Sequence, residues 1–304
     1  MGMEDFNLAD LAAHFSDPTA AAEFLESIRW PDGVVCPHCG QDERAPYRLN
    51  SKATKRRLWK CPACRKQFTV TVGTIFESSH IPLNKWLLAF YLLCSSKKGM
   101  SAHQLHRSLG VTYKTAWFMF HRIRHAMADE DFQRAMTGVV EVDETYIGGK
   151  AKGGKRGRGA PNKTAVVTLV QRDGTSRSFR AANVTAKELQ GAVLRHVDRS
   201  ARIMTDQFAS YRGLDERFAS HETVDHSKDE YVRGDVHTNS VEGFFANLKR
   251  GITGIYHHVS EAQLPRYLGE FDYRYSTRWM TDGQRTVQAL VQTEGKRLMY
   301  SDSR

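Results

Sequence analysis

The sequence predicts an α/β protein: a mixed five-stranded sheet with flanking helices, preceded by a cysteine-bearing module and a helical segment. Three observations carry this prediction. Strand-like and helix-like patterns alternate from Val139 to about residue 250. Four of the five cysteines stand in two CxxC pairs upstream of that region. Between the two regions, residues 82–127 follow a helical apolar pattern that is interrupted at two glycines.

The composition is typical of a folded protein that meets a polyanion. The chain has 304 residues, room for two or three domains, and 40% of them are hydrophobic. Its net charge of +10 favours a nucleic-acid partner, because each phosphate that is neutralised releases counterions. The start of the chain lacks the pattern of an export signal, and the most apolar stretch, Trp86 to Cys94, is far shorter than the roughly 20 residues that span a bilayer. We therefore expect a cytoplasmic protein without a membrane partner.

Changes of pattern divide the chain into five predicted parts. They are an N-terminal helical segment (1–30), a ribbon (31–80), a helix-turn-helix-like domain (81–130), an α/β domain (138–280) and a C-terminal tail (281–304). The first part contains a helix that begins at Asp17-Pro18, since aspartate is a favoured N-cap and proline suits the first helical position.

Two cysteine pairs form the strongest motif of the N-terminal half. They are Cys36-Pro-His-Cys39 and Cys61-Pro-Ala-Cys64. A CxxC turn points both thiolates at one metal ion, and two such turns complete the tetrahedral shell that Zn²⁺ accepts. The sequence therefore predicts a structural zinc ribbon. A thioredoxin-like redox pair is the alternative, which the presence of two matched pairs disfavours.

A helix-turn-helix pattern follows the ribbon. A short amphipathic helix, Ser101 to Leu109, is followed by a turn at Gly110 and by a second helix from Tyr113 to Ala126. The second helix of such a motif docks in the major groove of DNA. We expect DNA contacts from three of its basic side chains, Lys114, Arg122 and Arg124. The alternative is an ordinary helical linker.

Acidic residues mark two strands and one helix of the α/β domain. Residues 139–147 alternate as a strand does, so that Glu141, Asp143 and Thr145 share one side, with Glu141 as a spare acid. A second apolar strand ends at Asp206. A helix over residues 238–250 carries Glu242 and, two turns later on the same face, Lys249.

The elements between these acids complete the predicted sheet. Two strand candidates, 164–171 and 176–182, follow the Asp143 strand, and a helix over 186–197 precedes the Asp206 strand. A short strand near 223–226 comes before the Glu242 helix. A five-stranded mixed sheet with this order gathers the three acids at adjacent strand ends and one helix.

This order resembles the RNase H-like catalytic domain of DDE transposases and retroviral integrases, where a gap like the 35 residues between Asp206 and Glu242 is familiar. From about residue 20 to 280, the chain is similar to bacterial insertion-sequence transposases that join an N-terminal zinc ribbon to an ISXO2-like domain. The phrases that carry the resemblance are Val142-Asp-Glu-Thr-Tyr-Ile-Gly-Gly149, Thr205-Asp-Gln-Phe-Ala-Ser-Tyr211, His237-Thr-Asn-Ser-Val-Glu-Gly-Phe-Phe245, Leu248-Lys-Arg-Gly251, Tyr256-His-His-Val-Ser260 and Glu270-Phe-Asp-Tyr-Arg274.

The resemblance implies a DNA transposase that binds insertion-sequence ends and catalyses cleavage and strand transfer with a DDE triad. Two Mg²⁺ or Mn²⁺ ions would stabilise the attacking and leaving oxygens. Asp143 would bridge both ions, while Asp206 and Glu242 would hold one each, with Lys249 also in the site. Some similar transposases use an asparagine as the third residue, and Asn239 lies three residues before Glu242. Both alternatives stay open from the sequence.

Further basic residues are expected to contact double-stranded DNA, both the transposon ends and the target. They are Lys150, Lys152, Lys155, Arg156 and Arg158 in an acid-free segment beside the Asp143 strand, together with His237, Lys249 and Arg250. Because two DNA ends must be joined, the resemblance also implies a homodimer or larger assembly on DNA, in the bacterial nucleoid.

Two other functions are compatible with parts of the sequence. A domesticated DNA-binding regulator would use the ribbon and the helix-turn-helix without chemistry, but it would have no need of the three acids. A stand-alone RNase H-like nuclease would need the acids, but it would leave the two N-terminal modules without a task. Strand transfer of a DNA end separates these alternatives from a transposase.

Overall fold

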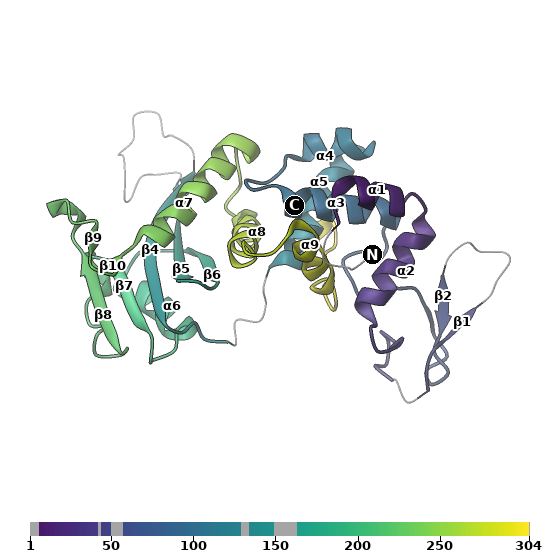
Figure 1. Ribbon diagram of the computed structural model, residues 1–304, viewed down its shortest axis with the longest axis horizontal. Helices are drawn as coiled ribbons and strands as arrows, with labels where there is room; N and C mark the ends of the chain where they lie inside the picture. Colours follow the sequence, from purple (N-terminus) through teal and green to yellow (C-terminus); the bar gives the residue numbers. More distant parts are fainter. Residues whose placement is uncertain (1–5, 42–43, 50–56, 129–133, 149–162, 304) are drawn as a thin grey trace. The chain divides into compact units, whose positions relative to one another are not determined.

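The computed structural model describes residues 6–41, 44–49, 57–128, 134–148 and 163–303 (Figure 1). Contacts within the chain divide it into two compact units. Unit 1 consists of Met1–Met127 and Trp279–Arg304, and unit 2 consists of Ala128–Arg278. No helix in the described ranges is long and apolar enough to cross a membrane.

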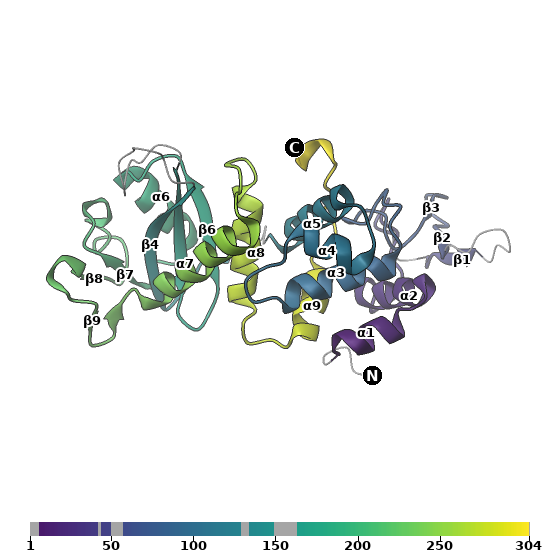
Figure 2. The same ribbon diagram turned by 90° about the horizontal axis from the view of Figure 1, so that it is seen from above.

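Unit 1 is a helical body that carries a small sheet. Its helices are α1 (Leu8–His14), α2 (Pro18–Arg29), α3 (Leu83–Ser95), α4 (Ala102–Leu109), α5 (Tyr113–Met127) and α9 (Asp282–Val291). Helix α3 is the central one: it contacts each of the others, and Figure 2 shows α5 and α9 beside it. Buried side chains such as Trp86, Leu87 and Phe90 lie on several sides of α3, as expected for a helix surrounded by protein.

The segment 281–304, expected as a C-terminal tail, is part of unit 1. Thr281 and Gln284 form a capping box that starts α9. The guanidinium of Arg285 donates to the main-chain oxygen of Cys94 at 2.9 Å, which joins α9 to the end of α3. Farther along, Glu294 forms an ion pair with Arg29 of α2. Closure of this unit therefore requires both ends of the chain.

The small sheet of unit 1 is the ribbon. Its strands β1 (Tyr47–Leu49), β2 (Leu58–Lys60) and β3 (Gln67–Phe68) are antiparallel and lie in that order. The carboxylate of Glu26 on α2 accepts hydrogen bonds from Arg57 and from the indole of Trp59. Trp30, just after α2, packs edge-on against Trp59 and Phe68. Helix α2 is therefore built into the ribbon rather than into a separate segment ending at residue 30.

Unit 2 contains the predicted five-stranded mixed sheet, which is confirmed. Its strands are β4 (Val139–Gly148), β5 (Lys163–Gln171), β6 (Ser176–Ala181), β7 (Arg202–Asp206) and β8 (Ser220–Val224), in the order β6-β5-β4-β7-β8. Strands β4, β7 and β8 run parallel, and β5 and β6 are antiparallel to their neighbours. A short hairpin of β9 (Val232–Arg233) and β10 (Val236–His237) follows β8.

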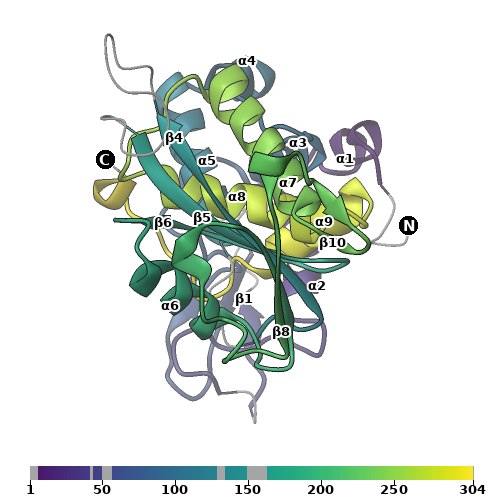
Figure 3. The same ribbon diagram turned by 90° about the vertical axis from the view of Figure 1, so that its left-hand side faces the viewer.

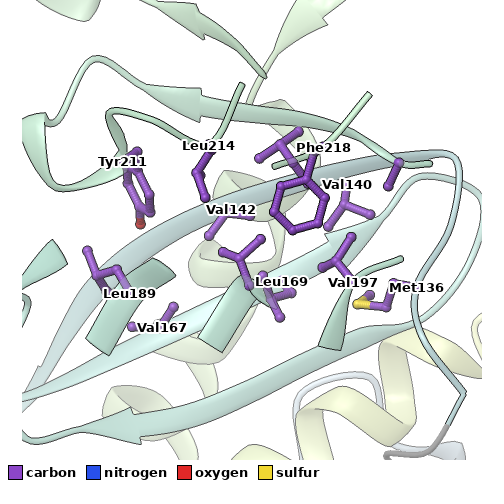
Figure 4. Packing of buried hydrophobic residues seen from close by; sticks show 13 residues of the cluster. Met136, Val140, Val142, Val167, Leu169, Leu189, Val197, Tyr211, Leu214 and Phe218 are labelled. Carbon is purple, nitrogen blue, oxygen red and sulfur yellow. The ribbon is translucent and has the colours of Figure 1, made fainter. Parts of the chain in front are cut away.

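Helices cover both faces of this sheet. Helix α6 (Ala186–His196) lies on one face, and α7 (Asn239–Gly251) and α8 (Leu264–Ser276) lie on the other (Figure 3). Val140 and Val142 of β4 pack on the α6 side, together with Leu189 and Tyr211 (Figure 4). Because side chains alternate along a strand, Glu141 and Asp143 point to the opposite face, which α7 covers. The alternation that the sequence predicts for β4 is therefore confirmed.

Candidate functional site

The four paired cysteines of unit 1 converge as the sequence predicts. Their sulfur atoms all lie within 4.8 Å of one another. The distances Cys36 Sγ to Cys64 Sγ and Cys39 Sγ to Cys61 Sγ are both 3.7 Å. A tetrahedral zinc ion with bonds of about 2.3 Å would separate its sulfur ligands by about 3.8 Å. The arrangement therefore fits a four-cysteine zinc ion.

Three carboxylates of unit 2 lie near the C-terminal end of β7. Strands β4 and β7 are parallel, with Val139 opposite Arg202 and Glu141 opposite Met204. The same register continued by two residues brings Asp143 next to Asp206, the last residue of β7. The third carboxylate, Glu242, stands in the first turn of α7, on the face to which Asp143 points.

The electrostatic surroundings of Asp143 reflect this gathering. Burial, together with the negative charges of Glu144, Asp206 and Glu242, raises the pKa of Asp143 from the usual 3.8 to about 8. A hydrogen bond from the main-chain N–H of Glu144 to Asp143 Oδ1, at 2.7 Å, acts in the opposite direction. Glu144 itself points to the other face of the sheet, where it accepts a hydrogen bond from the buried hydroxyl of Tyr211 at 2.9 Å.

The other two carboxylates are held by short local bonds. Asp206 Oδ1 accepts from the N–H of Phe208 at 2.9 Å. Glu242 Oε1 accepts from the hydroxyl of Thr238 at 2.8 Å, and it lies 3.5 Å from the Nε2 of His226. Both acids keep part of their surface in solvent. They are therefore oriented and still accessible.

The carboxylates are spaced more widely than the cysteines. In the described parts of the chain, the cysteines form the one group of at least three His, Cys, Asp or Glu side chains whose ligand atoms all lie within 4.8 Å. At least one pair among Asp143, Asp206 and Glu242 is therefore farther apart. Mg²⁺ and Mn²⁺ prefer oxygen ligands, so these three carboxylates are the residues that could hold such ions.

The remaining predicted site residues of α7 are on its surface. Asn239 is exposed at the first position of the helix, one turn before Glu242. Lys249 and Arg250 are exposed in the last turn, where the ammonium of Lys249 lies 5.9 Å from the ring centre of Phe245. Both basic residues are thus available to a ligand.

One functional residue was underestimated from the sequence. Glu141 was interpreted as a spare acid, but its side chain is fully buried and is bonded to the start of α7 and to Arg172. His237, expected to contact DNA, belongs to the same group: its Nδ1 lies 3.3 Å from Glu141 and 3.0 Å from Arg172. The sequence offered one indication that Glu141 lies near the site: it stands two residues before Asp143, on the same side of the strand.

The two helices predicted for the helix-turn-helix are confirmed as α4 and α5, joined at Gly110, whose φ of 60° suits glycine. Arg122 and Arg124, which were predicted to contact DNA, do not lie on the surface of unit 1. Both side chains are buried, and Arg122 donates to the main-chain oxygens of Ile75 and Glu77 at 2.7 and 3.1 Å. Their guanidinium groups contact other residues of unit 1: Arg122 bonds main-chain oxygens, and Arg124 lies over the ring of Phe120. Only Lys114, in the first turn of α5, is exposed.

The predicted basic segment cannot be placed in this site. Its residues Lys150, Lys152, Lys155, Arg156 and Arg158 lie outside the described residues.

Comparison with known proteins gives matches to two domain families and to a relative of nearly the same length. Residues 135–276 match the model of the ISXO2-like transposase domain, and residues 16–67 match that of the transposase zinc-ribbon domain. An uncharacterized protein in transposable element ISH50 of Halobacterium salinarum is 31% identical over 296 residues, which is 92% of this chain and 97% of that protein.

A solved structure, the Mos1 mariner paired end complex with Mn, matches 62% of this chain and 75% of its own chain at 12% identity. Its TM-score of 0.22 is too low to support an argument. The two domain matches and the nearly full-length relative are sufficient by themselves. This chain belongs to the insertion-sequence transposase family in which a transposase zinc ribbon is joined to an ISXO2-like transposase domain.

Proposed function

We propose that this protein is a DNA transposase that binds insertion-sequence ends and cuts and joins DNA at Asp143, Asp206 and Glu242. The observation that carries the proposal is the position of these carboxylates: Asp143 in the middle of β4, Asp206 at the end of the neighbouring β7, and Glu242 in the first turn of α7. All three lie within the part of the chain that matches the transposase domain.

The chemistry follows from the donor set. Two divalent ions, when bound, would stabilise the attacking and leaving oxygens of a phosphodiester exchange. Asp143, which is buried and close enough to Asp206 and Glu242 for their charges to raise its pKa, would hold the ions together with them. Asp206 and Glu242, which are partly exposed, are suited to hold one ion each and to leave room for phosphate oxygens.

The charge effect on Asp143 supports Glu242 as the third ligand, because its carboxylate is near enough to raise the pKa of Asp143. Asn239 stands one turn earlier and is also exposed. A carboxylate offsets the charge of two Mg²⁺ ions better than an amide does. We therefore assign Glu242 as the ligand and Asn239 as its neighbour near the DNA.

The decisive experiment measures cleavage and strand transfer of a DNA end with Mg²⁺ or Mn²⁺. Asp143→Ala and Asp206→Ala should reduce both steps to background, because both steps need the same ion pair. DNA binding should remain, since the proposed DNA-binding modules lie in unit 1. The control is Asp215→Ala, an exposed acid elsewhere in unit 2, which should retain wild-type rates. Cleavage by Asp143→Ala would contradict the proposal.

The third ligand needs its own comparison. Glu242→Gln keeps the shape of the side chain and removes its charge, so we expect it to lose cleavage at low Mg²⁺ concentrations. Asn239→Ala should retain cleavage at reduced efficiency. The reverse result, with Glu242→Gln active and Asn239→Ala inactive, would make the asparagine the third ligand.

End binding is assigned to the exposed part of the helix-turn-helix. In such motifs, the N-terminal residues of the second helix contact base edges. Here the first turn of α5 exposes Tyr113 and Lys114, and the ring of Tyr113 is stacked 4.2 Å from that of His103 on α4. Arg107 is exposed on the same short helix. These four side chains replace the buried arginines as the proposed contacts.

Salt dependence tests this surface. Lys114→Ala and Arg107→Ala should each weaken binding to a DNA end and reduce the slope of log affinity against log salt by about one unit per lost phosphate contact. Lys187→Ala, which removes an exposed charge from α6, is the control and should change neither quantity. Unchanged affinity and slope in both test variants would show that α4 and α5 do not bind DNA.

A further inference from the structure

Helix α7, which carries Glu242, begins without a cap of its own. The side chain of its N-cap residue, Thr238, accepts no hydrogen bond from the main-chain N–H groups of the first turn. The first N–H groups of a helix need an acceptor from elsewhere. Glu141 of β4 provides it: its Oε2 accepts from the N–H groups of Ser240 and Val241 at 2.7 and 3.0 Å. A negative charge at this end also interacts favourably with the helix dipole.

The second oxygen of Glu141 is equally occupied. Oε1 accepts from the hydroxyl of Ser240 at 2.9 Å and from Nε of Arg172 at 2.6 Å. These four bonds use the whole capacity of a carboxylate, and the side chain is fully buried. Such a group is stable only where all of its partners stay in place, so it acts as a rigid connection.

Arg172 extends this connection to the chain segment that leads into α7. Its guanidinium donates to the main-chain oxygens of Asp235 and His237, at 2.7 and 2.9 Å. Arg172 follows β5 directly, and β5 pairs with β4 along most of its length. The entry to α7 is therefore bound to the central strands of the sheet through two side chains, Glu141 and Arg172.

The position of Glu141 links the two proposed ion ligands. It stands two residues before Asp143 on the same side of β4, a distance of about 7 Å along the strand. The N–H groups that it accepts from belong to the residues just before Glu242. Glu242 itself accepts from the hydroxyl of Thr238, the N-cap residue, at 2.8 Å. A short and fully bonded path thus joins Asp143 to Glu242.

We propose that Glu141 is a positioning residue that binds the first turn of α7 to β4 and thereby sets the separation of Asp143 and Glu242. Its role is to tune the affinity of these two carboxylates for divalent ions without touching the ions or the DNA. This inference rests on the function proposed above, and it names a residue that acts through the ion ligands.

The test measures the rate of DNA cleavage against Mn²⁺ concentration, together with DNA affinity without added divalent ions. Glu141→Gln retains an acceptor for the helix but places an amide against Arg172. Glu141→Asp keeps the charge and shortens the reach by one methylene. Both variants should require about 10- to 100-fold more Mn²⁺ for half-maximal cleavage, the usual effect of changing a residue that orients a metal ligand. DNA affinity should stay at the wild-type value.

Glu270→Gln is the matched control. Glu270 is also fully buried in unit 2, but it lies on α8, where its carboxylate is paired with Arg274 at 2.8 Å and accepts from the hydroxyl of Tyr256 at 2.6 Å. It should lose stability as Glu141→Gln does and keep the wild-type Mn²⁺ requirement. An equal shift in Glu270→Gln would attribute the effect to stability alone and would overturn the proposal.

The remaining outcomes are also decisive. A folded Glu141→Asp protein with the wild-type Mn²⁺ requirement would overturn the positioning role, even if Glu141→Gln fails to fold. A wild-type protein that shows no cleavage with Mn²⁺ would refute the proposed function, and this inference with it. Wild-type cleavage combined with unshifted variants refutes the positioning role alone.

Discussion

At the scale of single residues, the groups that surround a buried carboxylate of unit 2 determine its bonding and its pKa. Glu141 is saturated by four hydrogen bonds and holds a helix. Asp143, two residues later, is set among other carboxylates, so its pKa is raised to about 8. Both side chains are largely removed from solvent on the same face of β4. The difference is that Glu141 meets donors, whereas Asp143 meets negative charges.

Asp272 on α8 is a third case and predicts a pH dependence. It accepts hydrogen bonds at 2.8 Å from the hydroxyl of Ser176 and from the N–H and hydroxyl of Ser178. Burial nevertheless raises the pKa of Asp272 from 3.8 to about 6. Because the folded state binds this proton more tightly than the unfolded state, the contribution to stability is complete below pH 3.8 and is lost as the pH rises through about 6.

We expect Asp272→Asn to remove this dependence. Between about pH 5 and about pH 7.5, the wild-type protein should lose roughly 1 kcal/mol of stability relative to the variant. Urea unfolding followed by far-UV circular dichroism at both pH values measures the difference. Glu261→Gln, an exposed acid of unit 2, is the control and should show no comparable change. A constant difference between Asp272→Asn and wild type at the two pH values would contradict the raised pKa.

At the scale of elements, one helix serves two roles along its length. The first turn of α5 exposes Tyr113 and Lys114, whereas the later turns bury Arg122 and Arg124 in the core. The guanidinium of Arg122 also accounts for three main-chain oxygens, including that of Leu298 at 3.1 Å. A basic residue near the middle of a recognition helix is therefore no evidence of a DNA contact unless it is exposed.

The ribbon is the element whose stability depends on a metal ion. Its three strands are short, and the cysteine cluster joins the segment before β1 to the loop between β2 and β3. We expect about one zinc per chain, and Cys61→Ser should lose it, because three thiolates hold the ion less well. Elemental analysis measures the zinc, and hydrogen exchange of β1 to β3 measures the fold. Cys94→Ser, which changes the cysteine of α3, should keep the zinc. Full zinc in Cys61→Ser would contradict the site.

At the scale of the whole molecule, the chain divides into two units that are not simply its first and second halves. Residues from both termini build unit 1, and unit 2 is the continuous stretch between them. The C-terminal segment contributes Leu290 and Leu298 to the buried core of unit 1. Its bonds reach α2 through Glu294 and α3 through Arg285. The stability of the N-terminal modules therefore depends on the last residues of the chain.

Removal of residues 279–304 tests this closure. We expect unit 1 to lose at least about 3 kcal/mol, since burying each leucine contributes about 1.5–3 kcal/mol. All five tryptophans belong to unit 1, and four remain after the truncation, so their fluorescence in urea follows this unit alone. Leu290→Ala should lower the transition midpoint, whereas Val291→Ala, whose side chain is exposed, should not. A truncated chain with the wild-type midpoint would contradict the closure.

The sequence by itself determined the elements, their order and the metal-binding candidates. Strand and helix patterns are local, because they depend on which side chains alternate within a few residues, and all five strands and α6 and α7 occur close to where they were predicted. The spacing of the cysteines was sufficient for the ribbon site, since a CxxC turn fixes the directions of its own thiolates. The triad remains a prediction that the geometry supports.

Only the tertiary structure decided which polar groups point inward. The burial of Arg122 depends on oxygens of Ile75 and Leu298, far from it in the chain. The proposed role of Glu141 depends on the N–H groups of Ser240 and Val241, about a hundred residues later, which no local pattern connects to β4. The place of α9 depends on α3 at the other end of the sequence. The neighbouring residues in the sequence predict which face of its strand or helix a side chain occupies. Its partners from distant parts of the chain determine whether it packs in the core, positions another residue or binds a ligand.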